Sequence, residues 1–136
     1  MKAGQTFFLI GEDSHLWMVI SDPAKDPTHI LLVNFTSWQH IHDQTCVVQV
    51  GEHPWLKTRS VVYYPAPRIV SLAQLEQRIQ YGLLSFHADL SPQLLRKIRV
   101  GALLSPFIPM AQTRTAGGAA PSVSSVRTSW GMMTPP

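Results

Sequence analysis

The chain has 136 residues, of which 45% are hydrophobic and only 14% are charged, so it is long and apolar enough to bury a core. No apolar stretch approaches the ~20 residues needed to cross a bilayer, and the single cysteine, Cys46, excludes an internal disulfide and any multi-thiolate metal site. The net charge of +3 is uneven, because residues 1–55 hold six acidic and two basic side chains (−4), whereas residues 56–136 hold two acidic and nine basic ones (+7). A cytoplasmic protein is the default expectation, and the basic second half would suit a polyanion among many other partners.

The first 70 residues predict short strands separated by turns. The strands are rich in β-branched and aromatic residues and cover residues 6–10, 16–20, 30–36, 45–50 and 59–64. The Pro65-Ala66-Pro67 segment is expected to break the last of them before a short extension at residues 68–70. Because no helix separates the strands, we expect a small curled sheet or barrel rather than a parallel α/β fold.

Two helices and a tail are predicted after residue 70. Ser71 can cap the first helix, with Gln74 in the capping-box position, and the Ser91-Pro92 pair begins the second. Each helix has an apolar face expected to point inward, formed by Leu72, Leu75 and Ile79 in the first and by Leu94, Leu95, Ile98 and Ala102 in the second. Pro, Gly, Ser, Thr and Ala dominate the end of the chain, so we predict a domain over residues 1–106 and a flexible, disordered tail over residues 107–136.

Several short signatures follow one another between residues 3 and 70. They are Ala3-Gly4-Gln5-Thr6, Leu16-Trp17-Met18-Val19-Ile20-Ser21, Asn34-Phe35-Thr36-Ser37, Gly51, Leu56 and Ser60-Val61-Val62. Together with a helix near the end, their order resembles that of the MazF/PemK-like family, the toxins of type II toxin–antitoxin systems. The resemblance implies a mainly β (α+β) fold, in which an SH3-like small β-barrel is followed by the two C-terminal helices and the tail.

The resemblance also implies a function. Family members are metal-independent endoribonucleases that need no cofactor, act on RNA, and are neutralised by a small acidic antitoxin protein; no membrane is involved, and a homodimer is compatible with this interpretation. The chain departs from the family at two places, since His15-Leu16 stands where members have an Arg-Pro pair and Asn34 stands where they have proline. Because the family arginine handles the scissile phosphate, the alternative is a non-catalytic barrel module that binds a protein or nucleic-acid partner.

Three residues are candidates for catalysis. RNA cleavage without a metal needs a base for the 2′-hydroxyl proton, an acid for the departing 5′-oxygen, and donors that stabilise the charge on phosphorus. Histidine suits both proton roles near neutral pH, so His15 in the first hairpin and His53 in the 51–55 loop are the predicted pair, with Thr36 as a donor. The alternative is that the histidines are ordinary surface residues and that Thr36 only closes its strand.

A second group is predicted to bind the substrate, and it consists of Ser37, Lys57, Arg59, Trp38 and Trp55. Ser37 could donate to a phosphate oxygen, and the two cations, two positions apart in an extended segment, would lie on one side and follow a phosphate backbone. The two tryptophans could stack on bases. The alternative is that the cations protect a strand edge and the tryptophans pack the barrel.

The His40-Ile41-His42-Asp43 segment places two imidazoles and a carboxylate close together in the sequence. Zinc accepts such ligands, but no further ligand follows at a characteristic spacing. We therefore expect no metal site and assign Asp43 to the turn that begins the next strand.

Overall fold

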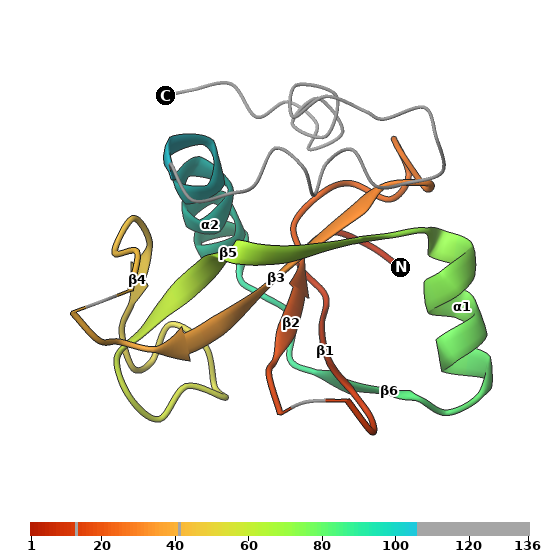
Figure 1. Ribbon diagram of the computed structural model, residues 1–136, viewed down its shortest axis with the longest axis horizontal. Coiled ribbons are helices and arrows are strands. Elements are labelled where there is room, and N and C mark those ends of the chain that lie inside the picture. Colours follow the sequence, from red (N-terminus) through yellow and green to blue (C-terminus); the bar gives the residue numbers. More distant parts are fainter. Residues whose placement is uncertain (13, 41, 106–136) are drawn as a thin grey trace.

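The computed structural model describes residues 1–12, 14–40 and 42–105, which form one curled antiparallel sheet and two helices (Figure 1). The sheet order is β4-β5-β3-β2-β1-β6, and every neighbouring pair is antiparallel. The strands are β1 (Thr6–Leu9), β2 (Trp17–Val19), β3 (Ile30–Ser37), β4 (Val47–Val48), β5 (Ser60–Val70) and β6 (Leu84–His87), and the helices are α1 (Leu72–Gln80) and α2 (Pro92–Leu104). The prediction of a mainly β fold with two later helices is confirmed.

The longest strand, β5, runs through the Pro65-Ala66-Pro67 segment, so the predicted break is wrong. Leu32 lies opposite Arg68, whereas Asn34 lies opposite Tyr63, so between these pairs β3 has one residue and β5 has four. The prolines therefore lie in a bulge, where no ladder hydrogen bond needs the N–H that they lack. The bulge lets β5 pair with β4 at its first end and lead into α1 at the other (Figure 1).

The two faces of the sheet carry separate cores, each covered by a different helix. The core under α2 consists of Leu16, Met18, Ile20, Leu31, Val33, Phe35, Cys46, Val48, Leu56, Val62, Tyr64, Leu90, Leu94, Ile98 and Ala102. The core under α1 consists of Phe7, Leu9, Trp17, Val19, Ile30, Leu32 and Leu75. Residues 16–20 contribute to the two cores in alternation, which confirms that this apolar run is buried on both sides.

The core under α2 is packed so closely that one helix position requires glycine. The Tyr64 hydroxyl donates a hydrogen bond to the carbonyl oxygen of Ile98 at 2.7 Å. A methyl group at Gly101 would overlap that hydroxyl and lie 3.0 Å from the Cβ atom of Cys46. Glycine therefore lets α2 approach β5.

Both predicted helix starts are confirmed. The Ser71 hydroxyl accepts a hydrogen bond from the backbone N–H of Gln74 at 3.1 Å, and the Gln74 side chain accepts one from the Ser71 N–H at 2.9 Å. Ser91 caps α2 in the same way, with proline in its first turn. The inward position of Ile79 is wrong, since 42% of its surface is exposed. This short helix buries only Leu75 fully, because it crosses the sheet near one edge.

Strand β6 was not predicted, and it forms an edge of the sheet by pairing with β1. The predicted strand over residues 45–50 is reduced to β4. The predicted tail, residues 107–136, lies outside the described residues. Within the described part of the chain, neither helix is long and apolar enough to span a membrane.

Candidate functional site

A surface groove with a volume of about 620 Å³ lies at the end of β3. Its described lining comes from β1, the β1–β2 loop, the end of β3, and the loop that leads into β5. The lining residues are Phe8, Ser14, His15, Phe35, Thr36, Ser37, Trp55, Leu56, Lys57, Thr58 and Ser60. The groove contains His15, Thr36, Ser37, Trp55 and Lys57, which are five of the eight predicted site residues.

Strand pairing brings these residues together from distant parts of the sequence. Because β2 runs antiparallel to β3, with Trp17 opposite Asn34, the loop that carries His15 lies beside the end of β3. Because the end of β3 pairs with the start of β5, with Ser37 opposite Ser60, the loop before β5 lies on the other side of that end. The three segments form the walls of one groove.

An aromatic cluster supports the groove. Trp55 is half-buried; its ring centroid lies 5.8 Å from that of Phe8 in an edge-to-face contact and 6.5 Å from that of Phe35 in a stacked one. These contacts hold the indole in place while part of it remains accessible. A planar ligand could therefore meet a rigid aromatic surface here.

The polar lining of the groove suits an anion. His15 and Lys57 are exposed, and Thr36 and Ser37 add two hydroxyl groups. None of the described lining residues is acidic. Hydroxyl and ammonium groups donate hydrogen bonds to phosphate oxygens, so the groove can accept a phosphodiester.

His53 lies behind the wall of the groove and does not line it. Its side chain is buried, with 1% of its surface exposed, and both ring nitrogens are engaged: Nε2 donates to the carbonyl oxygen of Ala88 at 2.7 Å, and Nδ1 accepts from the backbone N–H of Trp55 at 3.1 Å. Burial lowers the pKa of His53; the hydrogen bond to Ala88 opposes this shift, and nearby His87 adds to it. This arrangement does not fit the predicted proton-transfer role, so we correct that assignment: the neutral ring fastens the Trp55 loop to the segment after β6.

Trp38 and Arg59 lie beside the groove and pair with each other. The Arg59 guanidinium carbon is 4.0 Å from the centre of the Trp38 ring, and the Trp38 N–H donates to the Arg59 carbonyl oxygen at 3.0 Å. His40 contacts the same indole edge-to-face at 4.8 Å. Since neither Trp38 nor Arg59 lines the groove, the predicted alignment of Lys57 with Arg59 is wrong.

A second hollow, of about 390 Å³, adjoins the groove and shares His15 and Thr36 with it. Its other described lining residues are Trp17, Asn34, Tyr63, Ala66 and Arg68. The sequence analysis did not identify this hollow. The available signal was an asparagine in the middle of the apolar Ile30-Leu31-Leu32-Val33-Asn34-Phe35 run, where a buried amide needs a partner.

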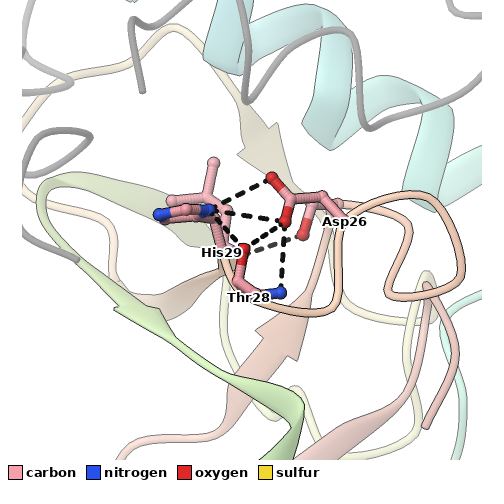
Figure 2. Close-up of polar contacts among 5 residues, drawn as sticks. Asp26, Thr28 and His29 are labelled. Carbon is pink, nitrogen blue, oxygen red and sulfur yellow. Dashed lines mark hydrogen bonds and ion pairs between the residues drawn. The ribbon is translucent and has the colours of Figure 1, made fainter. Parts of the chain in front are cut away.

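Figure 2 shows another polar cluster, in the loop between β2 and β3. The Thr28 hydroxyl donates to Asp26 Oδ1 at 2.7 Å and lies 2.8 Å from His29 Nδ1, which is 3.3 Å from Asp26 Oδ2 (Figure 2). Partial burial opposes ionisation of Asp26, but the hydrogen bonds from Thr28 and the nearby His29 hold its pKa below the usual value. The loop is tied to α1 by a hydrogen bond from the N–H of Leu72 to the carbonyl oxygen of Pro27 at 2.7 Å. All three residues of the cluster belong to one tight turn, which explains their contacts without a ligand.

Across residues 1–12, 14–40 and 42–105, no group of His, Cys, Asp and Glu side chains is arranged to hold a metal ion. Comparisons with known proteins found no match to a protein-family model, to a curated protein, or to a solved structure.

Proposed function

We propose that the protein is a toxin of the MazF/PemK-like kind, with an SH3-like barrel, that binds RNA in the groove and cleaves it without a metal ion. The observation that supports this function best is the meeting of His15, Thr36, Ser37 and Lys57 around one cavity, with no acidic side chain among its described lining residues. Beside them, Trp55 offers a surface on which an unpaired base can stack.

In the proposed reaction, His15 accepts the proton of the 2′-hydroxyl group, and the 2′-oxygen attacks the adjacent phosphorus. The bond to the 5′-oxygen breaks, and this oxygen takes a proton from water. Thr36, Ser37 and Lys57 donate hydrogen bonds to the phosphate oxygens as charge accumulates on them. The products are a 2′,3′-cyclic phosphate and a 5′-hydroxyl end.

The experiment is incubation of the purified protein with labelled single-stranded RNA in EDTA, followed by analysis of the new ends. The wild type should leave 2′,3′-cyclic phosphates, and His15→Ala should lose about 10²–10⁴-fold in rate. His40→Ala is the matched control, because His40 is an exposed histidine that does not line the groove. Equal loss in both variants, or no cleavage by the wild type, would overturn the enzymatic assignment.

A non-catalytic RNA-binding module is the second candidate. The burial of His53 favours it, because the groove then offers one imidazole where two were expected. Such a module would bind RNA more weakly as salt rises, and Lys57→Ala should reduce the salt slope by about one. Lys25→Ala, an exposed cation in the β2–β3 loop, is the control. Binding without cleavage would select this candidate.

A toxin also requires a partner that silences it. We propose a small acidic antitoxin protein in the cytoplasm, whose carboxylates would compete with RNA for the cationic groove. A neighbouring reading frame for such a protein would support the toxin, and co-expression should suppress RNA cleavage. We extend the proposal to a homodimer, which sedimentation analysis of the purified protein would test.

A further inference from the structure

The second hollow lies where a covered sheet face becomes polar. On β3, Ile30 and Leu32 belong to the core under α1. Because side chains alternate along a strand, Asn34 and Thr36 continue the same face, and both line the hollow instead of that core. The sequence thus exchanges apolar for hydrogen-bonding side chains at the end of one face.

Asn34 is the unusual member of this face. Only 6% of its surface is exposed, yet its Oδ1 atom has no hydrogen-bond partner. Its cross-strand neighbours are Trp17 on β2 and Tyr63 on β5, and both line the hollow. A buried carbonyl oxygen without a donor is destabilising, and such groups are rare in folded proteins. The missing donor is therefore a feature that a ligand can supply.

The walls around Asn34 restrict the chemistry of that ligand. Arg68 lies with its guanidinium carbon 4.8 Å from the centre of the Trp17 ring and binds Glu12 at 2.6 Å, so contacts on both sides hold it as a wall. Tyr63 is half-buried and presents an aromatic ring. A phosphate has only acceptor oxygens and cannot satisfy Asn34 Oδ1, whereas a nucleobase has N–H donors on its edge and two aromatic faces.

We propose that the second hollow binds one unpaired nucleobase, whose N–H group donates to Asn34 Oδ1 while its ring packs against Tyr63. This inference rests on the proposed RNA function, because the hollow shares His15 and Thr36 with the groove and so receives a base adjacent to the phosphate held there. Asn34 is then a specificity-determining residue. It selects the base by its hydrogen-bonding edge, whereas the groove binds the backbone of any sequence.

The test measures binding of short fluorescent homopolymers of adenylate, cytidylate and uridylate by anisotropy in EDTA, together with free AMP, CMP and UMP as competitors. The wild type should prefer one base, and Asn34→Leu should reduce that preference by about 10- to 100-fold while leaving the weaker homopolymers unchanged. Leucine fills nearly the same volume without an unpaired acceptor, so this variant should also melt at a higher temperature. Thr58→Ala, which alters the groove but not the hollow, should keep the preference.

The outcomes separate this inference from the proposed function. If homopolymers bind but Asn34→Leu keeps the wild-type preference, the base site is refuted and the RNA groove stands. If no RNA binds, both fail. If a free nucleotide competes with the same dependence on Asn34, the hollow holds a base without the polymer. Should Asn34→Leu fail to fold, Tyr63→Leu provides the same test, because loss of the aromatic face should weaken the preferred homopolymer about 5- to 100-fold.

Discussion

Replacement of His53 by alanine should destabilise the fold. The variant would leave the Ala88 carbonyl oxygen and the Trp55 N–H without their present partners, which lie 2.7 Å and 3.1 Å from the ring nitrogens. Each buried group left unpaired costs about 1–3 kcal/mol, and the vacated space beside Phe35 adds a cavity penalty. We expect a total loss of about 3–5 kcal/mol, which is a large part of the ~5–15 kcal/mol typical of a domain.

Urea unfolding followed by circular dichroism would measure this loss. His15→Ala is the matched control, because His15 is exposed in the same region and its removal should change the free energy of unfolding by less than about 0.5 kcal/mol. If His53→Ala were as stable as His15→Ala, the structural role of the buried ring would be refuted, and its assignment to proton transfer would have to be reconsidered.

The same ring predicts how stability depends on pH. Burial lowers the pKa of His53 in the folded state, whereas the unfolded ring titrates near ~6.5. The unfolded state therefore binds the proton first as the solution is acidified. The stability that depends on the neutral ring is fully present above pH ~6.5 and is lost as pH falls from there toward the folded-state pKa. His53→Gln, which has no titrating ring, should lose less stability between about pH 7.5 and pH 5; parallel losses would contradict this explanation.

Three further predictions concern the two cores. Gly101→Ala should lower the melting temperature by several degrees, because the new methyl group would overlap the Tyr64 hydroxyl; an unchanged melting curve would show that α2 can shift at no cost. Leu75→Asp should prevent cooperative folding by burying a carboxylate, whereas Ile79→Asp on the exposed face of the same helix should not; two equally stable variants would refute the packing of α1. The Cys46 thiol, whose pKa burial raises to about 11, should resist a disulfide reagent at pH ~8 until the protein is unfolded; rapid modification of the native protein would show that the core opens readily.

The features that the sequence predicted well are local ones. The capping box at Ser71 and the Ser91-Pro92 start fix helix beginnings within a few residues, so both could be predicted without the rest of the chain. The course of β5 through Pro65-Ala66-Pro67 depends instead on its register against β3, which is set far away in the sequence. Likewise, β6 has no clear alternation and becomes a strand by pairing with β1.

The candidate site divides in the same way. His15 and Thr36 were predicted from their positions at strand ends, and antiparallel pairing brings such ends together. Whether a histidine in a polar loop is exposed or buried is decided by what packs on it, so the burial of His53 under residues 87–90 could not be deduced from its neighbours in the sequence. The unpaired Oδ1 of Asn34 required the same tertiary information, because only the structure shows which donors are absent around it.

The most direct test of the RNA-binding groove is an amide chemical-shift map of the isotopically labelled full chain with single-stranded RNA. The prediction is that the largest changes fall on His15, Thr36, Ser37 and Lys57, together with the Trp55 indole, and that the amides of α1 stay unchanged. Changes centred on α1, or an unaltered spectrum at saturating RNA, would contradict the assignment of the groove as the RNA-binding site.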